Sequence, residues 1–305
     1  MRVVVALGGN ALLRPGEPTN SETQRRHVGE AAETLGGLAG EHELIVTHGN
    51  GPQVGWLAQQ AQADPGGERP LDVLDAETEG MIGYWIEQEL ASRLPGAEFA
   101  TLLTQVEVDA DDPAFARPSK PIGAAWPEAQ ARELAARHGW QVAETARGWR
   151  RVVPSPEPRA LLELAAIRLL VDAGIVVVCG GGGGIPVVRE SSGLLRGVEA
   201  VIDKDLCAAL LAESLEAEAL LLLTDVEAVY ADWPQPMREP IARASPAQLR
   251  ERAFEAGSMA PKVEAACRFA ASRPGRFAAV GALERADAVL AGDAGTRVED
   301  EGWRS

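Results

Sequence analysis

Six short apolar runs are spaced along this chain, and segments with helical periodicity, such as residues 21–38, separate them. The runs cover residues 3–7, 44–47, 100–108, 175–179, 219–223 and 277–280. An apolar run without polar alternation predicts a strand that is buried on both faces, and intervening helices predict a parallel sheet. The expected fold class is therefore α/β, an open three-layer α/β/α sandwich with a mainly parallel central sheet.

A long amphipathic helix is predicted over residues 75–94, from Asp75 to Leu94. Its large apolar side chains, among them Ile82 and Trp85, recur at helical spacing. Packing against the core explains this pattern. The adjacent aromatic pair of Tyr84 and Trp85 also permits a subunit interface.

Residues 109–158 differ from the rest of the chain because they are rich in Pro and Trp. A short helix over residues 127–138 and a strand over residues 141–145 fit inside this segment. A surface loop of this length without a function would be unusual in a compact domain. We therefore predict a small protruding lid subdomain at about residues 112–155, with a long surface loop as the alternative.

The charge balance of the 305 residues restricts the possible partners. The formal net charge is −16 and the pI is about 4.8. This acidity argues against binding to nucleic acid or to an anionic membrane, and the apolar runs are too short to span a bilayer. An anionic small-molecule substrate would therefore need a local positive field.

The cysteines number three, an odd count, lie among apolar or small residues and form no Cys-x-x-Cys pair, and together these features indicate a reducing compartment. Cys179 is expected to be a small buried residue at a strand end rather than a nucleophile. The four histidines show no metal-ligand spacing, and the N-terminus shows no signal peptide. A cytoplasmic protein is the expectation.

Three turns rich in glycine directly follow predicted strands. They are Gly8-Gly9-Asn10, Gly49-Asn50-Gly51 and residues 180–184. Ligands of open α/β sheets bind at the carboxyl ends of the strands, and glycine lets backbone N–H groups approach an anion closely. Together the turns predict a phosphate site, although the chain has no Gly-x-x-x-x-Gly-Lys-Ser/Thr motif.

The chain contains only three lysines, Lys120, Lys204 and Lys262, against 26 arginines. A lysine ammonium is a compact charge on a flexible stem, which suits contact with a moving phosphoryl group better than a wide guanidinium does. Asp203 and Asp205 flank Lys204 at a predicted helix start. One carboxylate could orient lysines while the other caps the helix, and the alternative is a plain helix cap with surface charges.

Seven segments of the chain match, in order, the motifs of a known protein family. They are residues 8–12, 48–55, 120–123, 151–156, 181–186, 198–205 and 257–262. In this order they resemble the carbamate kinases, within the amino-acid kinase superfamily. Many members of the superfamily carry a lysine before the first Gly-Gly turn, where this chain reads Ala6-Leu7-Gly8-Gly9. The resemblance implies that Lys120, together with Lys204, replaces that charge.

The resemblance implies a reversible phosphoryl transfer, carbamoyl phosphate + ADP ⇌ carbamate + ATP, with Mg²⁺ held mainly by the phosphates, in arginine or related nitrogen catabolism. Residues 1–210 would bind carbamoyl phosphate or carbamate, and residues 211–305 would bind ATP or ADP. The implied catalytic residues are Lys120, Lys204, Lys262 and Asp205. The implied substrate-binding residues are Gly8, Gly9, Asn10, Gly49, Asn50, Gly51, Gly181 and Gly182. The implied nucleotide-binding residues are Asp203, Thr224, Asp225, Val226, Tyr230, Met259, Pro261 and Lys262.

The resemblance also implies a homodimer, for which the helix over residues 75–94 is the candidate interface. Two alternatives are an enzyme of this fold that phosphorylates another small carboxylate or phosphate acceptor, and a non-catalytic nucleotide-sensing module. Another acceptor would require a larger pocket, and a sensing module would not need all three lysines and Asp205. A dehydrogenase is disfavoured because no clear Gly-x-Gly-x-x-Gly motif with its acidic partner is present.

Overall fold

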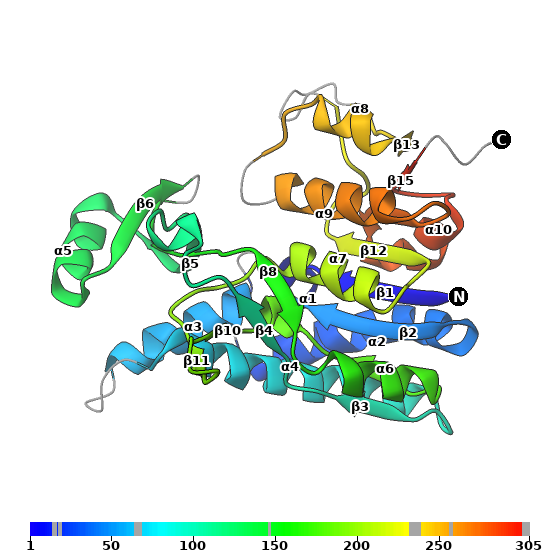
Figure 1. The fold of residues 1–305 in the computed structure, drawn as a ribbon, viewed down its shortest axis with the longest axis horizontal. Helices are drawn as coiled ribbons and strands as arrows, with labels where there is room; N and C mark the ends of the chain where they lie inside the picture. Colours follow the sequence, from blue (N-terminus) through cyan, green and yellow to red (C-terminus); the bar gives the residue numbers. More distant parts are fainter. Residues whose placement is uncertain are drawn as a thin grey trace.

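The computed structural model describes residues 1–13, 17, 20–63, 69–145, 148–231, 239–255 and 259–300 (Figure 1). Its main sheet has the strand order β13-β15-β14-β12-β1-β2-β9-β3. These strands are β13 (Arg243–Ala244), β15 (Thr296–Glu299), β14 (Phe277–Ala282), β12 (Ala219–Thr224), β1 (Arg2–Leu7), β2 (Glu43–His48), β9 (Val176–Val178) and β3 (Phe99–Thr101). All neighbouring pairs are parallel except β14 and β15.

Helices cover both faces of this sheet, which confirms the predicted three-layer α/β/α sandwich (Figure 1). Alternate residues of β1 point to opposite cores, because Val3 and Val5 belong to one buried cluster and Val4 and Ala6 to the other. The first face carries α2 (Ser21–Glu41), α4 (Leu71–Arg93) and α10 (Ala286–Ala291). The second face carries α6 (Leu164–Asp172), α7 (Lys204–Ser214), α9 (Met259–Ser272) and the short α8 (Pro246–Arg250).

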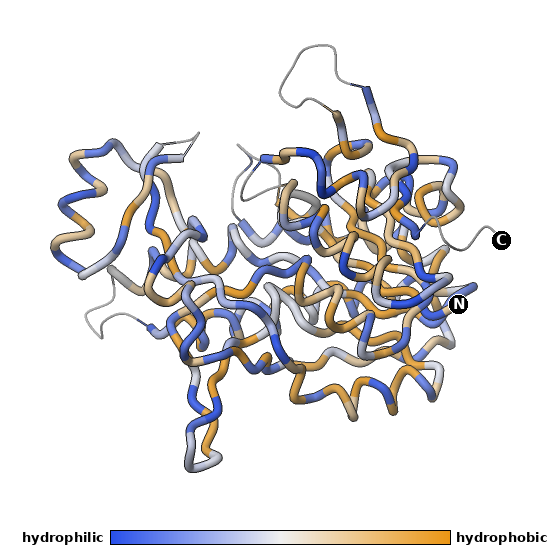
Figure 2. The backbone as a smooth tube through the Cα atoms, turned by 45° about the horizontal axis from the view of Figure 1, so that its top comes forward, coloured by the Kyte–Doolittle hydropathy of each residue, from blue (hydrophilic) through white to orange (hydrophobic). Residues whose placement is uncertain are grey.

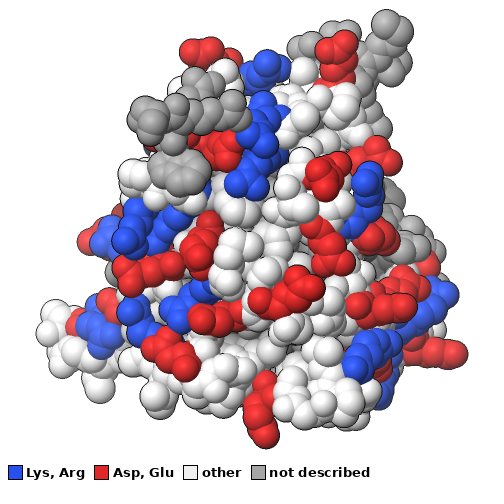
Figure 3. Space-filling view, turned by 90° about the vertical axis from the view of Figure 1, so that its right-hand side faces the viewer, with Lys and Arg blue, Asp and Glu red and all other residues white. Residues whose placement is uncertain are grey.

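The backbone coloured by hydropathy shows the same organisation, with apolar segments concentrated in the central layer (Figure 2). The face in Figure 3 has basic and acidic side chains interspersed rather than a continuous patch of one sign. No helix in the described part of the chain is both long and apolar enough to cross a membrane.

The prediction of one strand over residues 100–108 is wrong, because this run is divided between two sheets. β3 ends at Thr101 on the edge of the main sheet, and β4 (Gln105–Val108) lies in a second sheet with the order β11-β10-β4-β8. The chain turns between them, where the Thr104 N–H donates to a carboxylate of α4 rather than to a strand. An apolar run does not show where a chain changes sheets, so the sequence pattern did not predict β8 (Pro158–Leu161), β10 (Ile185–Arg189) or β11 (Leu195–Gly197) either.

The predicted subdomain forms a separate three-stranded sheet that protrudes from the sandwich (Figure 1, left). It consists of β5 (Lys120–Trp126), α5 (Glu128–His138), β6 (Gln141–Thr145) and β7 (Gly148–Val153), so the predicted helix and strand are confirmed. Its three tryptophans are partly buried and pack against neighbouring side chains. Trp126 and Trp140 stack with ring centroids 6.5 Å apart, and the Arg132 guanidinium lies 4.8 Å from the Trp149 ring centroid.

The base of this subdomain is fixed to the sandwich by close packing. Ile122 and Val153 belong to one buried cluster with Val54 of α3 (Gly51–Ala63) and with α4. Gly55 of α3 lies directly against Gly123 of β5, and a Cβ added to Gly55 would lie 2.6 Å from the Gly123 Cα atom. The contact therefore requires glycine at position 55.

Replacement of Gly55 by alanine tests this anchor. We expect Gly55→Ala to lower the free energy of unfolding by about 1–3 kcal/mol, because backbone atoms on both sides must separate. Proteolysis within residues 120–153 should also become faster. Gly36→Ala in α2 is the matched control, since nothing lies within 4 Å of its added Cβ and helical alanine is favoured over glycine by up to about 1 kcal/mol. Equal stability changes in the two variants, measured by denaturant unfolding, would contradict the anchor.

Candidate active site

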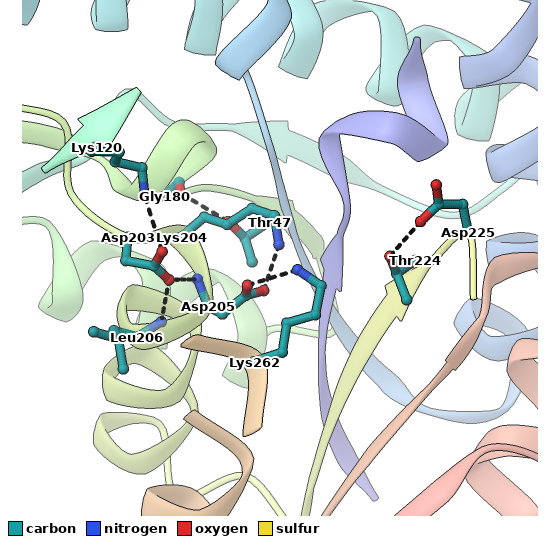
Figure 4. A network of polar contacts seen from close by, with 10 residues as sticks. All are labelled: Thr47, Lys120, Gly180, Asp203, Lys204, Asp205, Leu206, Thr224, Asp225 and Lys262. Carbon is teal, nitrogen blue, oxygen red and sulfur yellow. Dashed lines mark hydrogen bonds and ion pairs between the residues drawn. The ribbon is translucent and has the colours of Figure 1, made fainter. Parts of the chain in front are cut away.

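The carboxyl ends of four adjacent strands bring the predicted turns together. β1 lies between β2 and β12, and β9 follows β2, so Gly8-Gly9, residues 48–50, residues 180–184 and Thr224-Asp225 emerge at one edge. The Thr47 hydroxyl donates to the Gly180 carbonyl at 2.7 Å and joins two of these turns (Figure 4). The convergence follows from parallel strand order.

Some of the predicted backbone donors are used inside the fold. The N–H groups of Gly8 and Gly49 donate to the carbonyls of Leu223 and Leu7, at 2.8 and 2.9 Å. The N–H of Gly181 donates to a carboxylate of α4 at 2.8 Å. The backbone N–H groups of Gly9, Gly51 and Gly182 have no acceptor among the described residues and are therefore available to an anion. The Asn10 side chain lies outside the described part of the chain.

The three lysines lie together, around two aspartates (Figure 4). Lys204 and Lys262 both form ion pairs with Asp205, one with each carboxylate oxygen, and Lys262 Nζ lies 2.9 Å from Oδ2. Lys120 reaches in from the protruding subdomain and places its Nζ 2.9 Å from Oδ2 of Asp203. The lysine side chains are only 13–27% exposed, so they are not ordinary surface charges.

Asp203 has two functions in this arrangement. Its Oδ1 accepts hydrogen bonds from the N–H groups of Asp205 and Leu206, at 3.0 and 3.3 Å, and so caps the N-terminus of α7. Its Oδ2 accepts the Lys120 ammonium. The cap places Lys204 and Asp205 in the first turn of α7, so the local sequence orients the whole cluster.

Burial and charge act in opposite directions on this cluster. Burial alone would raise the pKa of Asp205, but Lys204 and Lys262 outweigh it and hold that pKa well below its ordinary value. Burial lowers the pKa of Lys204 to about 8, with Asp205 opposing the shift. Burial also opposes the charge of Lys262, but Asp205 outweighs burial there and raises the pKa of Lys262. Lys262 therefore remains charged at pH values at which Lys204 begins to lose its proton.

The predicted nucleotide-binding residues lie on the other side of the lysine pair. Thr224 and Asp225 are on the opposite side of Lys204 and Lys262 from Lys120 and Gly180 (Figure 4). The Thr224 hydroxyl donates to Asp225 Oδ1 at 3.0 Å. Met259 and Pro261 lie in the first turn of α9, which supplies Lys262, while Gly257 and Ser258 lie outside the described residues. Tyr230, in the segment after β12, forms a bridge with Pro240, and Val226 lies close to Asp225 in the chain.

The sequence interpretation missed a set of buried polar side chains on α4. Asp75, Thr78 and Glu79 are each at most 1% exposed. The two carboxylate oxygens of Glu79 accept from the N–H groups of Gly181 and Thr104, at 2.8 and 3.1 Å. The sequence did contain a signal for them: Asp75, Thr78 and Glu79 stand at positions i, i+3 and i+4, in line with the apolar stripe of this helix.

Burial raises the pKa of Glu79 from 4.5 to about 8. Because the folded-state pKa is the higher one, the protonated form is favoured in the fold, and the associated stability is complete below pH 4.5 and is lost as the pH rises from there to about 8. Burial likewise lowers the pKa of His48, beside the same glycine turn, to about 4. His48 is therefore neutral near pH 7.

The described residues contain no group of three or more His, Cys, Asp or Glu side chains that could hold a metal ion. Both aspartates of the cluster are engaged by lysines. Cys179 is buried at the end of β9 as expected, and burial raises the pKa of its thiol. Neither a metal centre nor a thiolate nucleophile is supported by these residues.

Comparison with known proteins agrees with this geometry. The profile of the amino acid kinase family matches residues 1–277. Carbamate kinase of Rhizobium meliloti (strain 1021) is 52% identical over 97% of this chain and 92% of that protein, and carbamate kinase of Escherichia coli (strain K12) is 47% identical over 96% and 98%. The structure of carbamate kinase from Giardia lamblia bound to AMP-PNP superposes with a TM-score of 0.89 at 37% identity, over 98% of both chains. The chain belongs to the amino acid kinase family and, within it, to the carbamate kinases.

Proposed function

We propose that this protein transfers a phosphoryl group reversibly between carbamoyl phosphate and ADP, giving carbamate and ATP. The observation that carries the proposal is the pair of ammonium groups on Asp205, with Lys120 beside them on Asp203. Phosphoryl transfer requires positive charge around the transferring group and little covalent help from the protein. The cluster supplies this charge in a chain whose net charge is −16.

Each lysine has a distinct part in the proposal. Lys204 and Lys262 stabilise charge on the transferring phosphoryl group, and Asp205 keeps their ammonium groups in place. Lys120 binds the same group or the carbamate end from the lid. The glycine turns of residues 1–210 cradle carbamoyl phosphate, and residues 211–305 bind the nucleotide near Thr224, Asp225 and the start of α9.

Mg²⁺ enters this proposal with the nucleotide phosphates. The cation prefers oxygen ligands and commonly combines substrate phosphates with few protein groups. The residues of the site fit a cation that is held mainly by phosphates, because the Asp203 and Asp205 carboxylates are already paired with lysines. Its contribution is to neutralise phosphate charge in the bound nucleotide.

The first test is ATP formation from carbamoyl phosphate and Mg·ADP, followed with luciferase. We expect the wild-type protein to form ATP and Lys204→Ala to lower kcat by about 10²–10³, because a preorganised charge at the transferring group is lost. Arg196→Ala removes a cation that is 60% exposed on β11 and serves as the control. A folded wild-type protein that forms no ATP would refute the proposed reaction.

The pH dependence provides an independent test of Lys204. We expect kcat/KM for carbamoyl phosphate to fall above pH 8, because this ratio reports the free enzyme, in which Lys204 has a pKa of about 8. Lys204→Arg keeps the charge to much higher pH, so this variant should be slower but lack the decline. Glu79 titrates in the same range. A decline that persists in Lys204→Arg would therefore assign it to Glu79 and contradict the role of Lys204.

We further propose a cytoplasmic homodimer that uses the outer face of α4. All three cysteines are free and buried, which suits a reducing compartment. Trp85 is only 7% exposed and packs into the core with α2, so it contributes to folding rather than to an interface. On the opposite side of α4, Tyr84 is 53% exposed, and Leu103, which is 50% exposed, lies beside Gly80. These apolar side chains are the candidate contact.

Substitution of Tyr84 by glutamate tests this contact. We expect Tyr84→Glu to halve the mass measured by light scattering after size-exclusion chromatography, with little change in Tm. Leu169→Glu is the control, since Leu169 is 71% exposed on α6, on the opposite face of the sheet. A wild-type monomer, or a variant with the wild-type mass, would disprove the α4 interface.

A further inference from the structure

The amide of Asn50 has a single orientation that the surrounding hydrogen bonds determine. Its Nδ2 donates to Asp75 Oδ1 at 3.0 Å and to Thr78 Oγ1 at 2.9 Å. The Thr78 hydroxyl uses its own proton on the Leu74 and Asp75 carbonyls, at 2.9 and 3.0 Å, so it can only accept from Asn50. Both amide protons therefore point into α4, and a flipped amide would place its oxygen against Thr78 Oγ1, whose proton is already used.

The carbonyl oxygen of the same amide is left for the site. Among the described residues, no donor reaches Asn50 Oδ1, although the residue is only 2% exposed. Two neighbouring polar atoms without a partner in the described part of the chain, Asp75 Oδ2 and His48 Nε2, are fully enclosed by protein. Asn50 Oδ1 also lacks a partner there but is not fully enclosed, so it borders open space. Gly182, with φ of +70°, packs directly against this amide, because a Cβ there would lie 2.2 Å from Asn50 Nδ2 and 2.6 Å from Oδ1, so a side chain at this position would displace the amide.

This oxygen lies on the acceptor side of the lysines. A Cβ added to Gly49, next to Asn50, would lie 3.3 Å from Cδ of Lys204. Thr47 ties the same strand end to Gly180, and both lie across the lysine pair from Thr224 and Asp225 (Figure 4). Because attacking and leaving groups are roughly in line in phosphoryl transfer, the group on the side away from the nucleotide is the carbamoyl group.

We propose that Oδ1 of Asn50 accepts a hydrogen bond from the amino group of the carbamoyl substrate and selects N–H over a methyl group. Asp75 and Thr78 are positioning residues that hold the amide in this orientation. The inference rests on the proposed phosphoryl transfer. A lone neutral oxygen is a poor site for Mg²⁺, whereas an N–H donor is its ordinary partner.

Acetyl phosphate is the matched probe, because it replaces the amino group by a methyl group of similar size. We would measure kcat/KM for carbamoyl phosphate, and the turnover or competitive inhibition constant for acetyl phosphate, with Mg·ADP. In Asn50→Ala we expect kcat/KM for carbamoyl phosphate to fall about 10- to 100-fold. Acetyl phosphate should be affected much less, so the discrimination between the two compounds should fall by a similar factor.

Thr78→Val provides a second variant that keeps the shape of the side chain. It removes one acceptor of the Asn50 amide, so we expect a smaller loss of the same discrimination. If activity with both phosphates falls equally, so that the discrimination is unchanged, the role of Asn50 is purely structural and the proposal is overturned. Restoration of both activities to the same extent by excess Mg²⁺ would also overturn it. A wild-type protein that forms no ATP from carbamoyl phosphate would instead refute the proposed function itself.

Discussion

The shared carboxylate of Asp205 is the interaction on which the rest of the site depends. It holds the ammonium groups of Lys204 and Lys262 side by side with most of their surface removed from water. Without it, mutual repulsion and burial would drive protons off the lysines, and breaking such a pair leaves a buried charge uncompensated at a cost of about 3–5 kcal/mol. In the proposed reaction, a phosphoryl group would use both charges, supported by the N-terminus of α7.

The position of the Asp205 carboxylate depends on the helix cap made by Asp203 and on the protruding subdomain. Asp203 caps α7 and also accepts Lys120, so the helix start and the protruding subdomain meet at one side chain. The subdomain is held in turn by Ile122, Val153 and the contact between Gly55 and Gly123. This buried packing therefore also fixes the position of Lys120 beside Asp203.

Helix α4 is joined by hydrogen bonds to two of the glycine turns, at Asn50 and Gly181. Burying Asp75 and Glu79 is costly, as the raised pKa values of both carboxyls indicate. The cost is offset by hydrogen bonds that orient Asn50 and bind the turns at Thr104 and Gly181. Polar groups in the interior of a helix thus serve the geometry of the site rather than the stability of the fold.

The sequence alone determined the fold class and the glycine turns, because periodicity and local turn chemistry are properties of short segments, and it singled out the three lysines that the structure brings together. It also identified the residues around Lys204, since a helix cap is local. Only the tertiary structure decided that residues 100–108 divide between two sheets and that Trp85 packs inward while Tyr84 faces out. It alone showed that Asp75, Thr78 and Glu79 contact the glycine turns, because those contacts join residues that are 25 to 102 positions apart in the chain.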